Sequence, residues 1–227
     1  MSRTKITREF FNQVSQKWDN VQLIKLGNML SAIFNKNING LFTKEKLTVL
    51  DFGAGTLTTC IPLVLNNDRI EKLYAVDISE KMLEKGKKKL EDLKNTEFSD
   101  RFELKAIDLT TETEFPEKVD VVVSSMAFHH LKEPKKMLKV LKSLLKENGC
   151  IMFVDYTLTE TSYYFHPAQL REEVHAGFET EKVLEWLKEL DGQKHSCETF
   201  FHFEKPNNVE NEPQVIEFDL FLALAKF

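Results

Sequence analysis

The sequence has few cysteines, and they lie far apart. Cys60, Cys150 and Cys197 make no C-x-x-C pair, and no Asn-x-Ser/Thr sequence occurs among the 227 residues. Both features are typical of a protein kept in a reducing compartment. We expect neither a disulfide framework nor a cysteine-based zinc site, and no metal site is predicted. The three cysteines are interpreted as buried small hydrophobic residues.

Long apolar runs and a basic excess are also absent. No segment approaches the roughly 18 consecutive apolar residues of a membrane-spanning helix. The first residues, MSRTKITREFF, lack the apolar core of a signal peptide. The chain has 31 Lys and Arg residues against 36 Asp and Glu residues, a net charge of −5, which does not favour a nucleic-acid partner. We therefore expect a cytoplasmic protein that binds neither membranes nor nucleic acid.

Few residues interrupt the chain, which has only eight Gly and six Pro and no repeat or low-complexity linker. One domain is expected over residues 1–227. Residues 5–36 carry apolar side chains at near-helical spacing, which predicts two short amphipathic helices, so that residues 1–40 would form a helical cover. The core would extend over 46–227, with an insertion at about 156–176.

After residue 46, short apolar runs alternate with stretches of helical period. Buried strands are predicted at 47–52, 72–78, 101–109, 119–126 and 149–156. The clearest helical stripe lies at 134–147 and is expected to end at Asn148-Gly149. The lysines of 81–94 and 132–146 are interpreted as the solvated faces of two helices.

Strands that alternate with helices favour a parallel sheet with helices on both faces. The last two apolar runs, 195–204 and 215–227, flank a turn-rich segment and predict a hairpin that closes the sheet antiparallel. The predicted fold class is therefore α/β, a doubly wound and mostly parallel sheet of seven strands.

The strongest chemical signal is LDFGAGT, residues 50–56, at the turn between a strand and a helix. Gly53 and Gly55, with Ala54 between them, let the backbone approach a ligand closely. Asp51 beside this loop would repel a pyrophosphate but attract the ammonium group of an amino-acid moiety. The loop therefore favours a cationic ligand over NAD.

Two further carboxylates follow the next two strands. Asp77 stands where a doubly wound sheet places a carboxylate that accepts both ribose hydroxyls. Ile78 would then lie against an adenine, and Asp108 is placed to receive the exocyclic amine of that base. Because the carboxyl ends of parallel strands meet in one crevice, Asp51, Asp77 and Asp108 should converge there.

In order and spacing, several segments resemble the successive motifs of class I S-adenosylmethionine-dependent methyltransferases, of the small-molecule branch with a helical N-terminal cover. These segments are LDFGAGT, YAVDIS, KAIDL, VDVVVSSMAFHHL and LLKENGCIMFVDY, and the resemblance covers about residues 10–227. It implies a Rossmann-like fold and S-adenosylmethionine as the cofactor. The cofactor-binding residues that it implies are Trp18, Asp51, Gly53, Ala54, Gly55, Asp77, Ile78, Asp108, Leu109, Ser124, Ser125 and Met126.

The chain departs from the family pattern at one position of the glycine-rich loop. The family commonly continues as Gly-Thr-Gly, whereas Leu57 stands at the position of the third glycine here. Its side chain would either crowd the cofactor or pack the following helix against the sheet.

Methyl transfer from a sulfonium needs alignment more than covalent help, because the methyl group is already activated. A base matters only where the acceptor is protonated, and neutral histidine suits that role. His129 and His130, after the fourth strand, are the catalytic candidates. Candidate contacts of the acceptor are Tyr156, Tyr164, His166 and His175, and the tyrosines would form either an aromatic lid or part of the core.

The function predicted from these residues is transfer of a methyl group from S-adenosylmethionine to a small-molecule acceptor. The alternative is a catalytically silent protein that binds S-adenosylmethionine or a partner and retains the fold. A third class, the NAD-dependent oxidoreductases, is disfavoured by Asp51. The sequence assigns neither the acceptor atom nor an oligomeric state, and it does not separate metabolite from protein acceptors.

Overall fold

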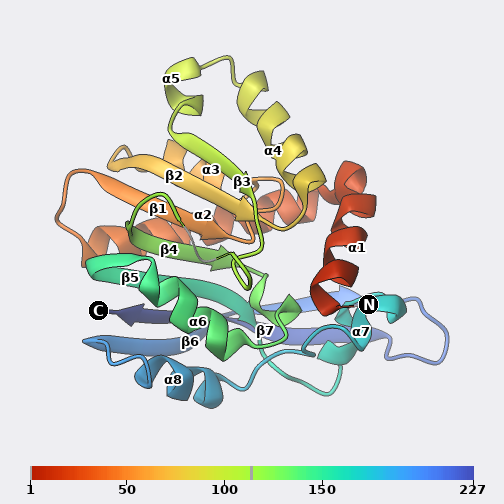
Figure 1. The fold of residues 1–227 in the computed structure, drawn as a ribbon. Helices are drawn as coiled ribbons and strands as arrows, with labels where there is room; N and C mark the ends of the chain where they lie inside the picture. The colour runs from red at the N-terminus through yellow and green to blue at the C-terminus, as the bar shows by residue number, and fades with distance from the viewer. Residues whose placement is uncertain (1, 113–114) are drawn as a thin grey trace.

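The structure, a computed structural model, describes residues 2–112 and 115–227. Within these residues, seven strands form one sheet in the order β3-β2-β1-β4-β5-β7-β6 (Figure 1). The strands are β1 (Leu47–Phe52), β2 (Ile70–Asp77), β3 (Phe102–Ala106), β4 (Val119–Ser125), β5 (Leu145–Tyr156), β6 (Lys194–Pro206) and β7 (Val215–Lys226). Strands β1 to β5 run parallel, and β7 runs antiparallel to both β5 and β6. The predicted doubly wound, mostly parallel sheet with an antiparallel C-terminal hairpin is confirmed.

Alternating apolar residues explain why the sheet is covered on both faces. In β4, Val121 and Val123 belong to one core, and Val122 belongs to the other. Successive side chains of a strand point to opposite faces, so a continuous valine run must be buried twice. Helices α2, α3 and α4 supply the first core, and α6 and α8 supply the second (Figure 1).

The helices are α1 (Arg3–Trp18), α2 (Val21–Leu41), α3 (Cys60–Leu65), α4 (Glu80–Asp92), α5 (Thr96–Ser99), α6 (Pro134–Ser143), α7 (Ala168–Arg171) and α8 (Thr180–Lys188), with 3-10 turns η1 (Phe128–His130) and η2 (Ser162–Phe165). The two predicted N-terminal helices are α1 and α2, and α2 extends beyond the predicted end at residue 36. Ser2 and Asn20 cap them, since their side chains accept the backbone N–H groups of Lys5 and Leu23. None of the helices described is long and apolar enough to cross a lipid bilayer.

The end of α6 differs from the sequence-based expectation. The helix ends at Ser143 rather than at 147, because Leu145 already pairs with Val119 in the sheet. The register then shifts before Cys150 pairs with Val121, and Asn148 adopts a φ of 61° in the intervening bulge. Asn148-Gly149 therefore turns the chain within β5 and does not end the helix.

Candidate functional site

A cavity of about 500 Å³ lies where the parallel strands end. Its volume falls within the range of about 300–1,000 Å³ that is typical of small-molecule sites. The ends of β1, β2 and β4 form its floor, and α1 and α2, which we call the cover, contribute another wall. Figure 1 shows α1 beside the arrowhead ends of these strands. The topology therefore brings the N-terminal helices and the carboxyl ends of the parallel strands to one site.

The glycine-rich loop after β1 forms part of this floor. Gly53 and Gly55 have φ values of 75° and 53°, which L-residues with side chains rarely adopt. A Cβ atom on Gly53 would lie 2.5 Å from the Cβ atom of Ala127, so there is no room for a side chain there. The backbone N–H groups of Gly53 and Ala54 donate to the carbonyl oxygen of Val76, which joins the loop to the end of β2.

Asp77 at the end of β2 holds the loop and lines the cavity with Ile78. Its Oδ2 atom accepts the N–H of Gly55 at 2.8 Å, and its Oδ1 atom accepts the N–H of Ser79 at 2.8 Å. Burial raises the pKa of Asp77 to about 6, although these two N–H groups oppose the rise. Each carboxylate oxygen has a further lone pair with which to accept a hydroxyl group of a ligand.

Asp51 lies in β1 behind the loop and is only 1% exposed. It is not among the residues that line the cavity. Neither of its carboxylate oxygens has a hydrogen-bond partner among the described residues. Burial raises the pKa of Asp51 to about 7. The nearby Cys60 thiol lowers this pKa, and the negative charge of Asp77 raises it further. A cation bound at the loop would therefore favour ionisation of a carboxyl group that is otherwise unpaired.

The segment after β3 contributes Ile107 and Asp108 to the cavity wall. The Oδ1 atom of Asp108 accepts the N–H of Thr110 at 2.9 Å and its hydroxyl group at 2.5 Å. Leu109, by contrast, is buried in the core beneath α6 and does not line the cavity. The structure thus places Ile107 where the family resemblance implied Leu109, because Leu109 lies in the turn that follows Asp108 and its side chain enters the core.

The end of β4 and the residue after it contribute to the cavity only in part. Ser125 and Met126 line the cavity, whereas Ser124 is buried. The hydroxyl group of Ser124 donates to the carbonyl oxygen of Phe52 at 2.7 Å, which joins β4 to the end of β1. Ser124 therefore holds the floor of the cavity from behind.

The cover reaches the cavity through aromatic side chains of α1. Trp18 lines the cavity together with Phe11, whose ring meets the ring of Trp18 edge to face at a centroid distance of 5.2 Å. The Phe11 ring also meets the ring of His130 at 5.0 Å. Phe11 therefore links the cover to the segment that follows β4.

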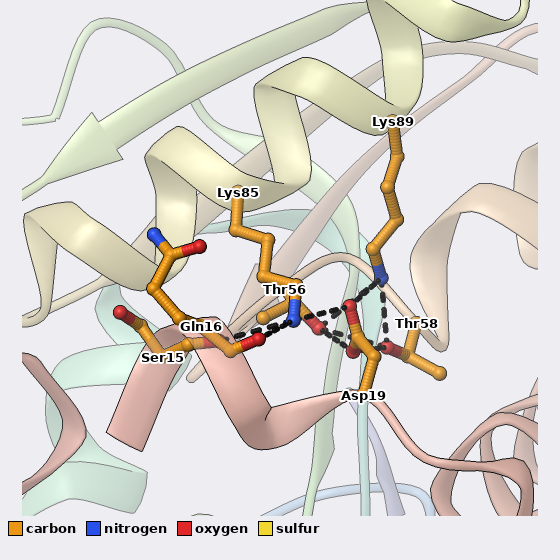
Figure 2. A network of polar contacts seen from close by, with 7 residues as sticks. All are labelled: Ser15, Gln16, Asp19, Thr56, Thr58, Lys85 and Lys89. Carbon is orange, nitrogen blue, oxygen red and sulfur yellow. Dashed lines mark hydrogen bonds and ion pairs between the residues drawn. The ribbon is translucent and has the colours of Figure 1, made fainter. Parts of the chain in front are cut away.

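Asp19, between α1 and α2, fastens the cover to the glycine-rich loop and to α4. Its Oδ1 atom accepts the hydroxyl groups of Thr56 at 2.5 Å and Thr58 at 3.1 Å. Its Oδ2 atom pairs with Lys85 at 3.4 Å and Lys89 at 3.1 Å, as Figure 2 shows. Burial would raise the pKa of Asp19, but the hydrogen bonds and charges of these partners lower it below its ordinary value. We call this group of five residues the latch.

The latch corrects the interpretation of the α4 lysines as a solvated face. The side chains of Lys85 and Lys89 are only 20% and 30% exposed. Lys85 also donates to the backbone carbonyl oxygens of Ser15 and Gln16, at the end of α1 (Figure 2). Lys85 thus stabilises the carbonyl end of α1 as well as the Asp19 carboxylate.

The histidines after β4 differ in position. His130 lines the cavity, whereas His129 is buried behind it, with its Nδ1 atom 2.8 Å from the Oδ1 atom of Asp155. His175 does not line the cavity, and its Nε2 atom lies 3.0 Å from the carbonyl oxygen of Leu131. Burial lowers the pKa of His130 well below its ordinary value, which keeps this imidazole neutral.

The insertion after β5 does not reach the cavity. Tyr156 is fully buried, and its hydroxyl group donates to the carbonyl oxygen of His175. Tyr164 packs against the core on the α2 side, and His166 packs against His129 and His130. Of the two interpretations of these tyrosines, the structure favours the core over a lid, because the antiparallel β5–β7 pair extends under this segment.

Leu57 packs the following helix against the sheet. Its side chain is fully buried and is not among the cavity walls. Its φ is 62°, and a Cβ atom on Gly86 of α4 would lie 2.4 Å from its Cγ atom. Gly86 thus supplies the space in which Leu57 packs, and Leu57 does not crowd the cavity.

Sequence reasoning missed several cavity walls. They are Thr4, Thr7, Phe11, Leu23, Leu26, Gly27 and Leu30 from the cover, Thr56, Thr58 and Thr59 from the loop, and Leu131, Lys132, Glu133, Lys136, Met137 and Val140 from the segment after η1. The helical periodicity of residues 5–36 marks the cover side chains as one face. It does not tell a face that packs on a core from a face that lines a cavity.

The fold is that of class I methyltransferases. Residues 50–151 match a protein family described as methyltransferase domain. The magnesium protoporphyrin IX methyltransferase of Synechocystis, solved with bound S-adenosylhomocysteine, shares the fold, with a TM-score of 0.69 over 99% of both chains at 15% identity. The recognition of this class from the sequence is confirmed.

Several curated relatives are longer than this chain. The chain is 26% identical over 160 residues to an uncharacterized methyltransferase of Schizosaccharomyces pombe, a match that covers 67% of this chain and 55% of that protein. It is 24% identical over 230 residues to a malonyl-[acyl-carrier protein] O-methyltransferase of Acetivibrio thermocellus, a match that covers 98% of this chain and 75% of that protein. The chain spans about half the length of three of the curated relatives that it matches.

Proposed function

We propose that the protein is an enzyme that transfers a methyl group from S-adenosylmethionine to a small-molecule acceptor. The observation that carries this proposal is the position of Asp77, which lines the cavity while its two oxygens hold the glycine-rich loop. A carboxylate so placed accepts the two hydroxyl groups of a ribose. The division of the chain into a cover at 1–40 and a core at 46–227 is part of the proposal.

The residues present fit the cofactor. Asp77 would accept the ribose hydroxyl groups, and Asp108 would accept the exocyclic amine of adenine between Ile78 and Ile107. The backbone of the glycine-rich loop would lie against the methionine part. Asp51, whose carboxyl group is buried and unpaired among the described residues, would act on the ammonium group by charge from behind that loop.

Bound S-adenosylmethionine supplies an activated methyl group, so the chain itself must align the acceptor and exclude water. Phe11 and Trp18 of the cover line the cavity and would shield a bound acceptor from solvent on that side. His130 is the candidate histidine that lines the cavity, and burial keeps it neutral. It is therefore the residue that we assign to the acceptor end, where a neutral imidazole accepts a proton from a hydroxyl, amine or thiol.

Calorimetry with S-adenosylmethionine, S-adenosylhomocysteine and NAD tests the cofactor. We expect the first two to bind and NAD not to bind. Asp77→Asn should weaken binding, whereas Asp68→Asn, the same change at an exposed site before β2, should leave it unchanged. Binding of NAD in place of S-adenosylmethionine would refute the proposal.

Formation of S-adenosylhomocysteine with a panel of acceptors tests the reaction. The panel should contain hydroxyl, amine, thiol and carboxylate compounds, and a malonyl thioester belongs in it because of the Acetivibrio relative. Turnover with one class would identify the acceptor atom. Tight cofactor binding without turnover of any small compound would favour the alternative, a silent protein that retains the fold.

A further inference from the structure

Three histidine rings meet behind the wall of the cavity. His129 and His130 lie in η1, and His166 follows η2. One ring nitrogen of each histidine lies within 4.8 Å of one ring nitrogen of each of the others. The ring centroids are 4.1 Å apart for His129 and His130, 4.9 Å for His129 and His166, and 5.1 Å for His130 and His166.

Each of these rings has a buried nitrogen without a partner. Among the described residues, no hydrogen bond reaches the Nε2 atom of His129, the Nδ1 atom of His130 or the Nε2 atom of His166. His129 itself is only 1% exposed. Buried polar atoms are nearly always paired, so three unpaired nitrogens in one place point to a shared ligand that satisfies all of them.

Asp155 orients the first of these rings. Its Oδ1 atom lies 2.8 Å from the Nδ1 atom of His129, and its Oδ2 atom accepts the backbone N–H of His129 at 3.1 Å. In the neutral tautomer that donates from Nδ1 to this fully buried carboxylate, the lone pair of His129 is on Nε2. Metal-binding histidines characteristically donate their other ring N–H to a carboxylate in this way.

We propose that His129, His130 and His166 bind a divalent transition-metal ion of the zinc type. Three neutral imidazoles with an open fourth position suit such an ion. With Zn–N bonds of about 2.0–2.1 Å, ligand nitrogens in a tetrahedral site lie about 3.3 Å apart, so nitrogens that lie within 4.8 Å of one another would have to move together by up to about 1.5 Å. Because His130 lines the cavity, the cavity gives the ion a path of entry.

The sequence predicted no metal site, and the reason is spatial. His129 and His130 are adjacent in sequence, but His166 belongs to the insertion after β5, and only the packing of η2 on η1 brings it near. The spacing matches no ligand motif of the kind that can be recognised in a sequence. The proposal concerns metal binding alone, and where an ion is bound it replaces the proton-accepting role of His130, because a neutral imidazole has a single nitrogen lone pair.

Titration of chelator-treated full-length protein with Zn²⁺ and Co²⁺ tests the proposal. We expect one tightly bound equivalent, with Co²⁺ giving the visible absorption of a tetrahedral site. His129→Ala and His166→Ala should each weaken Zn²⁺ binding at least tenfold, and Asp155→Asn should weaken it by about 10- to 100-fold. His202→Ala is the matched control, because His202, Glu204 and Glu217 form a second, exposed cluster of possible ligands on β6 and β7.

A His166→Cys variant keeps the test decisive where an alanine variant unfolds. It preserves a ligand atom, so it should retain one equivalent of metal and add a thiolate-to-cobalt absorption band. Circular dichroism checks that each variant is folded. The proposal is overturned by a wild-type protein that binds no stoichiometric metal, by loss of the metal in His202→Ala, or by folded histidine variants that bind as tightly as the wild type.

Discussion

Replacing Leu57 by Gly tests whether the glycine-rich loop is impaired or merely packed differently. Leu57 is fully buried, has a φ of 62° and packs on Gly86 of α4 without lining the cavity. The structure therefore predicts that Leu57→Gly lowers stability and leaves the affinity for S-adenosylmethionine unchanged. If the Leu57 side chain crowded the cofactor, Leu57→Gly would instead bind S-adenosylmethionine more tightly, with little loss of stability.

The magnitude follows from two opposing contributions. Truncating a buried Leu to Ala costs about 2–5 kcal/mol through lost contacts and the cavity left behind. A left-handed backbone costs a residue with a Cβ about 1–2 kcal/mol, which Gly avoids. Leu57→Gly should thus be no less stable than Leu57→Ala, although Gly is the smaller residue. At a buried site with ordinary helical φ, the Gly variant would be the less stable one.

Urea unfolding followed by circular dichroism measures the free energies of unfolding, and calorimetry measures cofactor affinity. Gly86→Ala supplies the partner change, because its new Cβ would lie 2.4 Å from the Cγ atom of Leu57. This overpacking should cost about 1–3 kcal/mol on its own and less in the Leu57→Ala background. Strictly additive costs, or a Leu57→Gly variant that gains affinity, would refute the packing account.

Three further outcomes follow from the carboxylates. Asp77→Asn should weaken S-adenosylmethionine by about 1.5–3 kcal/mol, roughly 10- to 150-fold in calorimetry. Burial raises the pKa values of Asp77 and Asp51 to about 6 and about 7. Their contribution to the stability of the unliganded protein is therefore present at low pH and lost as the pH rises through those values. Cofactor affinity should rise over the same pH range, because the carboxylates ionise. Asp19→Asn should lower the free energy of unfolding by about 1–3 kcal/mol and speed cofactor release, read from Trp18 fluorescence in a Trp186→Phe background.

The strands were predictable from the sequence because a doubly covered sheet imposes a strong pattern. Residues buried on both faces give continuous apolar runs, and β1 was predicted with its observed bounds. The end of α6 was not predicted correctly. Leu144 and Leu145 continue the apolar stripe of a helix, but the same two residues could equally begin a buried strand. Pairing of Leu145 with Val119, a long-range contact, decides between the two.

The candidate carboxylates of the cavity were predictable in position but not in environment. Chain order places Asp77 and Asp108 at strand ends, where both line the cavity. Whether Leu109 or Ile107 faces the same cavity depends on the backbone direction after the strand ends, which apolar spacing does not determine. The latch was missed for a different reason: a lysine on a helix of high charge is solvated unless another segment covers it, and the covering segment lies more than 60 residues away in sequence.

The latch gives the cover a defined relation to the cofactor. Asp77 holds the glycine-rich loop at Gly55, and Asp19 holds the same loop one residue later, at Thr56. A ligand that hydrogen-bonds to Asp77 and orders this loop should therefore also change the free energy of the hydrogen bond between Thr56 and Asp19. Linkage makes this coupling reciprocal, so the factor by which the latch contacts raise cofactor affinity equals the factor by which the bound cofactor stabilises those contacts. It follows that the loss of affinity in Asp19→Asn measures the coupling directly, although Asp19 touches the loop and not the ribose.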